Sequence, residues 1–544
     1  MGRVRSVVAR ANQKVTVQIA ALLLSGATLI SFVFGFIRLR LLNAEYFDTY
    51  PEGLAAYVAA FKVPDFMFFM LVSGALSVTF IPVFNQRLAG GNKKSAWELS
   101  SSMMNLMAGA TFIASVLIII FAEPIIHLIA PGLGESTMAL AVSMMRVIAV
   151  NPFLFAIATV IASIQQAVGR FAFFTLAPII YNIGIVIGIV WFTDGINIFG
   201  WQVFEGGIMG VALGVAFGSV LQLLVSAIGL IGLGFDYRFK IYWKNKGFRE
   251  VLRLLPARSL DQGMDYLVGM AETNIASRFK PVVLTAYDQA MTLHMAPINL
   301  IGVAISTAAF PRMTERLSAG RTDLFRKELQ EMIRIIIWLA LPVAMVTFAT
   351  RGLIVSFIKN GGVQLIADLL GLLVIAILFR SVYYISARSF YAQQDTKTPL
   401  YISIFSIGLN IGLAIWLGLT LNMGAYGLAW AQSIASVIEV AILFFVMSRR
   451  IPGLFGGHFW KALGRMVIAG VLTGIVSYIL TKLFPFTIED DSIVRTLPKF
   501  VMIASFSLLA YVGFSWLLRI REANPVIVTM KKLLFGKLNV FKKR

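Results

Sequence analysis

The sequence is poor in residues that carry catalysis and in residues that face water. It contains no cysteine, three histidines in unrelated segments, and 13% charged residues, against about 25% in soluble proteins. The absence of cysteine excludes disulfides, thiolate metal sites and cysteine nucleophiles, and the scattered histidines predict no metal cluster. With 58% hydrophobic residues and a mean hydropathy of +0.83, too little polar surface remains for a water-soluble globule. We therefore predict a polytopic membrane protein.

Long apolar windows account for most of the chain. Fourteen are present, and each is long enough to span a membrane, since a helix needs about 20 apolar residues to cross about 30 Å of hydrocarbon. An even number of spans places both termini on one side. The predicted fold class is all-α with fourteen transmembrane helices. The windows are residues 15–42, 54–84, 98–122, 138–165, 171–193, 206–233, 252–278, 282–311, 328–350, 364–391, 398–420, 423–447, 460–484 and 497–519.

The charges of the loops orient these spans. If the N-terminus is cytoplasmic, the inside segments carry 32 Lys and Arg residues and the outside loops carry seven. An excess of this kind marks the cytoplasmic side of a membrane protein, so we expect both termini in the cytoplasm. The net charge of +21 then indicates contact with anionic membrane lipids rather than with nucleic acid.

The sequence repeats itself at a spacing of 228–229 residues. ALSVTFIPVFNQRLAGG (75–91) matches AISTAAFPRMTERLSAG (304–320), and Asn182 matches Asn410. Six spans per repeat give two parallel lobes, which is a known transporter plan with the substrate site where the halves meet. We predict an N-lobe at 1–235, a C-lobe at 236–450, two appended spans at 451–520 and a basic cytoplasmic tail at 521–544.

Several charged residues fall inside the predicted spans. A charge near the bilayer centre costs several kcal/mol unless it faces a cavity or a partner, so each is a functional candidate. Asp261, Asp265 and Glu272 in span 7 share one helical face, and we expect this face to line a solvated cavity. Three others are interpreted as snorkelling to an interface, namely Arg40, Asp288 and Arg380.

The segment SFYAQQDTKTPLYISIF (389–405) closely resembles the junction of spans 10 and 11 in the MurJ/MviN lipid II flippases. The resemblance continues in FGFIR (34–38), AFKVPDFMFFMLVSGALSVTFIPVF (60–84) and PINLIGVAISTAAFPRMTERLSAG (297–320). It implies a multidrug/oligosaccharidyl-lipid/polysaccharide exporter fold, in which two six-helix lobes surround a cationic cavity and the last two helices add a lipid-tail groove. The implied function is that of a transporter, not an enzyme, which moves lipid II from the inner to the outer leaflet of the bacterial cytoplasmic membrane.

A substrate site made of cations also follows from the resemblance, and a diphosphate needs such cations in a wet cavity. Of the family's cavity arginines, Arg38 carries over directly. The family's arginine in span 2 falls on Phe68 or Phe69, and the one in span 8 falls on Thr292. We predict that Arg38 binds the substrate and that the missing positive charge comes from Lys62, Arg146 and Arg258.

Coupling residues are expected in the second half of the chain. Asp261 and Asp265 are predicted either to hold Arg258 or to bind a coupling cation. The resemblance implies that Asn410 contributes to a cation site, as in some family members. No cofactor is expected. The sequence has no phosphate-binding loop of the Walker type, so Na⁺ or the membrane potential is the expected driving force.

Two other functions stay open at this point. The changed cavity residues are compatible with a flippase for another polyprenyl-linked glycan, or with a cation-coupled exporter of the same superfamily. A non-transporting scaffold would instead recruit cell-wall synthesis proteins through the basic tail REANPVIVTMKKLLFGKLNVFKKR (521–544). Such a tail is also typical of a helix that lies on anionic lipid.

The distribution of loop charges generates a topology prediction. Reporter fusions after Lys94 and Lys246 should give cytoplasmic signals, and a fusion after Asn197 should give an external signal, because the cations follow the cytoplasmic loops. A cytoplasmic signal at Asn197 would contradict the fourteen-span topology.

Overall fold

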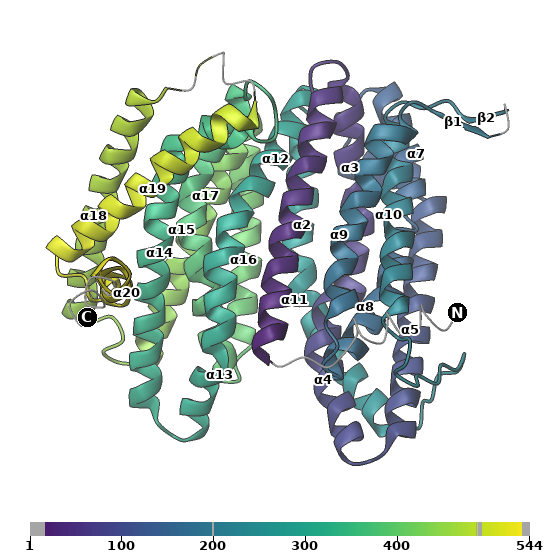
Figure 1. Cartoon of the computed structure of the whole chain (residues 1–544), viewed down its shortest axis with the longest axis horizontal. Helices are drawn as coiled ribbons and strands as arrows, with labels where there is room; N and C mark the ends of the chain where they lie inside the picture. The colour runs from purple at the N-terminus through teal and green to yellow at the C-terminus, as the bar shows by residue number, and fades with distance from the viewer. Residues whose placement is uncertain (1–16, 199–200, 486, 488–491, 536–544) are drawn as a thin grey trace, which may run out of the picture. The chain divides into compact units, whose positions relative to one another are not determined.

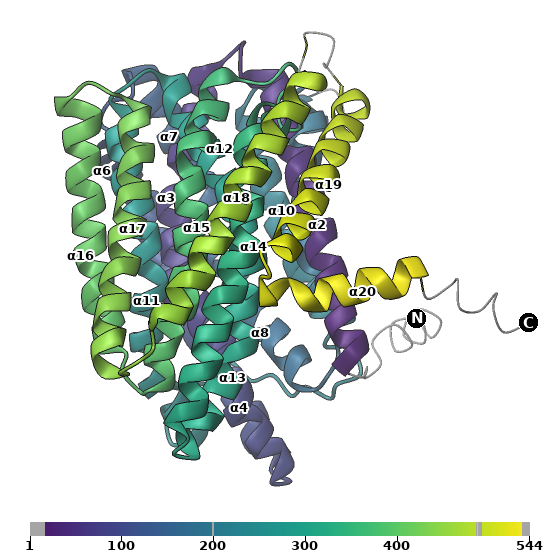
Figure 2. The same ribbon diagram turned by 90° about the vertical axis from the view of Figure 1, so that its left-hand side faces the viewer.

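The computed structural model describes residues 17–198, 201–485, 487 and 492–535, which are almost entirely helical (Figures 1 and 2). Thirteen helices in this part of the chain are long and apolar enough to cross a membrane. The predicted class, an all-α polytopic membrane protein, is therefore confirmed. The sheet found among these residues is a short antiparallel hairpin of β1 (Ile196–Ile198) and β2 (Trp201–Phe204).

The chain divides into two compact units, residues 1–285 and 286–544. In the first unit, long helices lie side by side and several are interrupted or ended by π-helical turns, labelled η. Its helices are α2 (Val17–Tyr46), α3 (Pro51–Phe68), η1 (Phe69–Ser73), α4 (Gly74–Ala89), α5 (Lys93–Ile120), α6 (Ala122–Ile129), α7 (Glu135–Ile148), α8 (Asn151–Ala167), α9 (Ala172–Ile187), η2 (Gly188–Phe192), α10 (Met209–Ile228) and α11 (Lys246–Ser277).

The second unit starts within α12 and contains the remaining helices. Two of them, α18 and α19, follow the repeat and pack on α14. The helices are α12 (Pro281–Ile298), η3 (Asn299–Val303), α13 (Ala304–Ser318), α14 (Thr322–Ser356), α15 (Gln364–Ala392), α16 (Lys397–Leu413), η4 (Ala414–Thr420), α17 (Ala425–Arg450), α18 (Gly457–Leu483), α19 (Ile493–Leu517), the 3₁₀ turn η5 (Arg521–Ala523) and α20 (Asn524–Phe535).

The seventh predicted span is helix α11, which is more polar than the thirteen apolar helices. It has 32 residues, and at about 1.5 Å per residue this length exceeds the thickness of the hydrocarbon. Helix α11 packs on α3, α4 and η1, so it belongs to the first compact unit. The lobe boundary predicted from the repeat, between 235 and 236, assigns the same helix to the second lobe.

The order of elements in the two units supports the internal repeat. Helix α12 starts 230 residues after α3 (281 against 51), α14 starts 229 after α5 (322 against 93) and α15 starts 229 after α7 (364 against 135). π-Helical turns also recur, since η1 and η3 interrupt the second helix of each repeat while η2 and η4 end the fifth. π-Helical turns are rare, so their recurrence at matching places is strong support for a duplication.

The last helices are tied to the second unit by polar contacts. The Trp338 indole on α14 donates to the Ser515 hydroxyl on α19 over 3.1 Å. The Arg334 guanidinium on α14 and the Glu522 carboxylate in η5 form a buried ion pair at 2.7 Å. Helix α20 then runs across the direction of α18 and α19 (Figure 2), an orientation that suits a helix lying on a membrane surface. The remainder of the predicted tail, from 536, lies outside the described residues.

Glycines allow α9 and α10 to approach one another closely. A Cβ built on Gly184 would lie 2.3 Å from the Gly218 Cα, and one built on Gly214 would lie 2.5 Å from the Gly188 Cα. Both neighbours are backbone atoms, so a side chain at either position would force the helices apart. Small residues at intervals of four are the usual means by which membrane helices come into backbone contact.

We predict that Gly214→Ala destabilises the protein because the added methyl group overpacks the contact of α10 with η2 and the end of α9. Overpacking typically costs about 1–3 kcal/mol, and the melting temperature of the purified protein in detergent should fall accordingly. Gly109→Ala on α5 is the matched control, because a Cβ there meets no neighbouring atom within 4 Å. Equal melting temperatures for the two variants would show that the contact at Gly214 is not tight.

Candidate functional site

A polar cluster lies in the first unit around the hydroxyl of Tyr181 on α9. Arg38 on α2 and Asp65 on α3 interact electrostatically with this hydroxyl. Both charged side chains are half-buried. The predicted substrate residue Arg38 is thus half-buried within electrostatic range of a carboxylate and a phenol. Such a cluster can hold a charged or strongly polar group.

Lys62 lies one turn before Asp65 on the same helix. The spacing of three residues places the two side chains on one face of α3, and both are half-buried. Each of them interacts with a neighbouring group. Helix α3 therefore contributes a cation and an anion, and the cation of Arg38 is added from α2.

Asn182, next to Tyr181, links α9 to α2. Its amide donates to the Ser31 hydroxyl over 3.3 Å and to the Pro178 carbonyl over 3.0 Å. Asn182 therefore bonds to a neighbouring helix. This bond helps to fix the rotation of α9 relative to α2.

Aromatic rings continue from this cluster towards α11. The ring of Tyr181 contacts Phe155 with centroids 5.1 Å apart, and Phe155 contacts Phe68 at 5.4 Å. Phe68 lies against Phe69, whose ring is stacked on Tyr266 of α11 at 4.3 Å. The two positions where the resemblance places a family arginine thus carry aromatic rings that pack on other rings.

Arg146 has a different environment from Arg38. Its side chain is exposed, and its Nε donates to the Ile119 carbonyl near the C-terminal end of α5 over 3.3 Å. A cation that binds the last carbonyls of a helix also interacts favourably with the helix dipole. The contact therefore ties α7 to α5, and the predicted role of Arg146 in substrate binding stays a prediction.

Three further predicted residues belong to α11. Arg258, Asp261 and Asp265 lie on the helix backbone between Lys246 and Ser277, but their side chains lie outside the described residues. Glu272, further along the same helix, is buried with 3% of its surface exposed. For Glu272, the expected solvated cavity is replaced by a buried environment in which the side chain interacts with neighbouring groups.

In the second unit, Asn410 lies buried on α16. Its amide donates to the Gln432 side-chain oxygen on α17 over 2.8 Å. Asn410 thus also bonds to a neighbouring helix. Asn182 and Asn410, which match in the repeat, therefore each join two helices of their own unit, although Asn182 reaches α2 and Asn410 reaches α17.

A buried ion pair between α15 and α17 was not predicted from the sequence. Arg380 and Glu439 lie 3.3 Å apart, with side chains 14% and 3% exposed. The Ser403 hydroxyl on α16 donates to Glu439 over 3.0 Å and is itself 3.0 Å from the Tyr383 hydroxyl. Snorkelling of Arg380 to an interface is therefore wrong, because its guanidinium finds a carboxylate inside the protein. Glu439, a carboxylate within an apolar span, was the available signal, since such a group requires a partner cation.

His294 on α12 extends this network. Its side chain is fully buried, its Nδ1 lies 2.7 Å from the Met291 carbonyl, and the charge of Arg380 acts on its ring. The interior of the second unit thus contains the Arg380–Glu439 ion pair and a buried histidine within electrostatic range of it.

The segment that carried the resemblance forms a turn between α15 and α16. Asp395 accepts hydrogen bonds from the Thr398 hydroxyl at 2.6 Å and from the backbone N–H groups of Lys397 and Thr398 at 3.0 Å. The Arg450 guanidinium at the end of α17 binds the same carboxylate at 2.6 Å and lies over the Phe390 ring. The turn therefore joins the ends of three helices.

Comparison with known proteins agrees with this arrangement. The sequence model of the family described as "Lipid II flippase MurJ" matches residues 52–497. The chain belongs to this family. A probable lipid II flippase MurJ of Thermotoga maritima is 24% identical over 92% of this chain and 96% of its own length. One of Borreliella burgdorferi is 23% identical over 79% of this chain and 83% of its own length.

Solved structures with the same fold include MurJ and its superfamily neighbours. A lipid II flippase MurJ in an inward closed conformation has a TM-score of 0.70 at 22% identity, over 95% of this chain and 99% of that protein. An inward-facing multidrug resistance MATE transporter has a TM-score of 0.65 at 16% identity, over 80% and 98%. The fold is thus that of the MurJ family, and within it this chain carries Phe68 and Phe69 where the resemblance places a cation.

We predict that Asp395→Asn destabilises the protein in a pH-dependent manner. Partial burial alone would raise the pKa of Asp395, but the hydrogen bonds from Thr398 and Arg450 outweigh it and lower the pKa from 3.8 to about 2. Because the folded-state pKa is depressed, the stabilisation is present above the unfolded pKa and is lost as the pH falls towards 2. The difference in melting temperature between wild type and variant should therefore shrink between about pH 4 and pH 2.

Matched arginine variants serve as controls for this prediction. Arg450→Gln should lower the melting temperature at neutral pH as Asp395→Asn does. Arg449→Gln should not, since Arg449 lies over the Phe445 ring and not on the turn. A loss for Asp395→Asn that is the same at every pH would mean that the charge of Asp395 contributes nothing.

Proposed function

We propose that this protein translocates lipid II, the undecaprenyl-diphosphate-linked peptidoglycan precursor, from the inner to the outer leaflet of the bacterial cytoplasmic membrane. The observation that carries the proposal is the match of the MurJ family over residues 52–497. Arg38 adds support, because the resemblance assigns it to the substrate site and it lies half-buried beside Asp65 and Tyr181.

Arg38 is the proposed contact for the diphosphate. A guanidinium offers paired N–H donors that match phosphate oxygens, and these charge-assisted bonds are strong away from bulk water. Lys62 is proposed to add a second positive charge from α3. Arg146 and Arg258 are proposed as further cations of the substrate site. Because Arg146 already donates to the Ile119 carbonyl, its contact with the substrate is proposed to be the weaker.

The driving force is proposed to be a cation gradient or the membrane potential. Asp261 and Asp265 on α11 are the proposed cation ligands. Asn410 is proposed to assist through its side-chain oxygen, since its amide donates to Gln432. Both termini are proposed to lie in the cytoplasm, an orientation supported by the 32 cations of the inside segments against seven outside.

A second candidate is a flippase for another polyprenyl-linked glycan. It is favoured by the aromatic rings at Phe68 and Phe69 and by Thr292, since the resemblance places family cations at these positions. Aromatic side chains provide faces on which sugar or lipid can pack, whereas arginine would contact phosphate. The two candidates share the diphosphate and differ in the glycan.

Complementation tests the proposal directly. In a bacterium depleted of its own lipid II flippase, expression of this chain should restore growth and render lipid II accessible to an externally added enzyme that cleaves it. Arg38→Ala should abolish both, with loss of about 1.5–3 kcal/mol of charge-assisted binding. Arg40→Ala is the matched control. Arg40 is also half-buried on α2 but lies two residues further on, on the opposite side of the helix, so its substitution should reduce transport only mildly.

The possible outcomes separate the two candidates. Membrane-inserted wild-type protein that fails to expose lipid II would contradict lipid II transport and favour the second glycan. Normal transport by Arg38→Ala would show that the family's substrate site does not carry over to this residue.

A further inference from the structure

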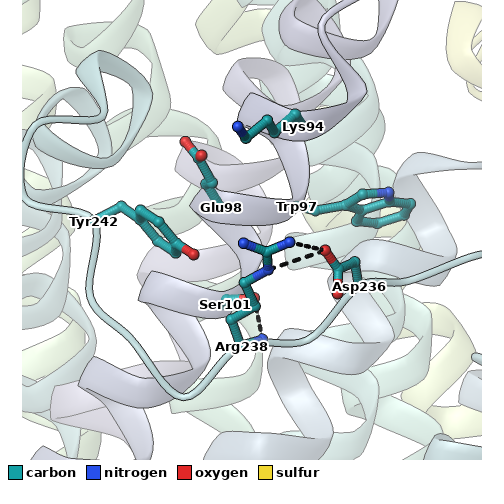
Figure 3. Close-up of a pocket in the computed structure, with 7 residues that line it drawn as sticks. All are labelled: Lys94, Trp97, Glu98, Ser101, Asp236, Arg238 and Tyr242. Carbon is teal, nitrogen blue, oxygen red and sulfur yellow. Dashed lines mark hydrogen bonds and ion pairs between the residues drawn. The ribbon is translucent and has the colours of Figure 1, made fainter.

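A cavity of about 400 Å³ lies in the first unit between helix α5 and the segment that follows α10. Helix α5 contributes Lys94, Trp97 and Glu98 to its lining. The opposite wall comes from Asp236, Arg238 and Tyr242 of the connecting segment (Figure 3). None of these residues belongs to the cluster around Arg38, so the cavity is distinct from the proposed substrate site.

The wall formed by the connecting segment is held in place by the polar face of α5. The Ser101 hydroxyl accepts from the Arg238 backbone N–H at 3.2 Å, and the Ser102 hydroxyl accepts from the Tyr242 N–H at 2.8 Å. Ser101 and Ser102 are buried. These two bonds thus fix the backbone of the connecting segment at Arg238 and at Tyr242, the two ends of this wall.

Asn105 continues this attachment one turn further along α5. Its amide donates to the carbonyls of Arg238 at 2.9 Å and Lys240 at 3.1 Å, and its oxygen accepts from the Tyr237 hydroxyl at 2.6 Å. The residue between the two bonded carbonyls is Phe239, which is 91% exposed. Three hydrogen bonds to Asn105 therefore hold the backbone around an aromatic side chain that is almost fully exposed.

The exposed aromatics indicate the depth of the cavity in the membrane. Trp243, four residues after Phe239, is also exposed. Further along α5, exposed apolar side chains begin at Phe112 and continue to Phe121, which marks the lipid-facing part of that helix. Exposed aromatic residues beside basic residues at the end of a span are typical of the membrane–water interface. The cavity therefore opens at the level of the lipid headgroups.

The charges that line the cavity are balanced. Lys94 and Arg238 are positive, while Glu98 and Asp236 are negative. Asp236 and Arg238 pair at 2.9 Å, but the guanidinium has more N–H donors than one carboxylate can accept. Figure 3 shows Trp97 and Tyr242 on opposite sides of these charges. A cavity of this kind suits a ligand that carries both an anion and a cation.

We propose that this cavity binds the headgroup of an aminophospholipid such as phosphatidylethanolamine. The phosphate accepts charge-assisted hydrogen bonds from Lys94 and Arg238. The ammonium group lies between Glu98 and the face of Trp97, where a carboxylate and an aromatic ring both favour a cation. The acyl chains leave the cavity along the apolar surface of α5, beside Phe239. The loop charges predict that this is the cytoplasmic end of α5, so the lipid comes from the inner leaflet.

Lipid retention tests the proposal. The full-length protein is purified in detergent, stripped of lipid, and mixed with dioleoylphosphatidylethanolamine or dioleoylphosphatidylglycerol before native mass spectrometry. Wild type should retain the ethanolamine lipid more strongly than the glycerol lipid. Lys94→Gln and Glu98→Gln should each reduce ethanolamine-lipid binding about tenfold, because each removes one charge-assisted contact.

Matched variants distinguish specific binding in this cavity from nonspecific attraction between charged residues and lipid. Lys93→Gln, which makes the same change on the neighbouring residue outside the cavity lining, and Glu250→Gln on α11 should leave retention unchanged. Equal retention of both lipids, or equal losses for Lys93→Gln and Lys94→Gln, would overturn the proposal in favour of nonspecific contact with the bilayer. Competition by soluble glycerophosphoethanolamine as strong as that by the lipid would also overturn it, since the acyl chains would then contribute nothing.

Discussion

A polar group in the hydrocarbon region costs several kcal/mol unless it is paired within the protein, and the packing of both units depends on avoiding this cost. Hydroxyls within spans donate to a carbonyl one turn earlier, as Ser381 and Thr350 do. Amides reach the next helix, as Asn410 does to Gln432. Arg380 reaches Glu439. The bonds of Ser381 and Thr350 stay within their own helices. Those of Asn410 and Arg380 fix one helix against another, which apolar side chains all around a helix cannot do.

The same constraint explains how much of the fold can be predicted from the sequence. The fourteen apolar windows include span 7, the most polar of them, whereas thirteen helices among the described residues are long and apolar enough to cross a membrane and α11 is not one of these. The loop cations support α11 as a span, since removing one span would reverse the sides of every later loop. The repeat is visible because Pro, Arg and Asn are scarce in spans. Its structural counterpart, the recurrence of η1 as η3 and of η2 as η4, could not be foreseen, because π-helical turns have no sequence signature in this chain.

The site was predicted less completely, and the reason is helix rotation. Arg38 was identified through a motif, but its neighbours Asp65 and Tyr181 come from other helices. Arg380 and Glu439 are 59 residues apart, and nothing in their separate spans says that they face one another. Arg146, like Arg38, is a candidate because it is a cation within a predicted span, yet its side chain binds a backbone carbonyl on α5. Contacts between helices depend on tilt and rotation, which apolar periodicity does not determine when a span is hydrophobic on most of its faces.

The two units treat their membrane charges differently, and this bears on where a diphosphate would bind. In the second unit, Arg380 is matched by Glu439, and separating them would leave a buried charge without its partner, at considerable cost. In the first unit, Arg38 and Lys62 accompany Asp65, so this group of three half-buried side chains carries one net positive charge. An anionic headgroup restores neutrality there, whereas in the second unit it would compete with a carboxylate already bound. We therefore propose the first unit as the place where the headgroup binds, although the two units share one helical plan.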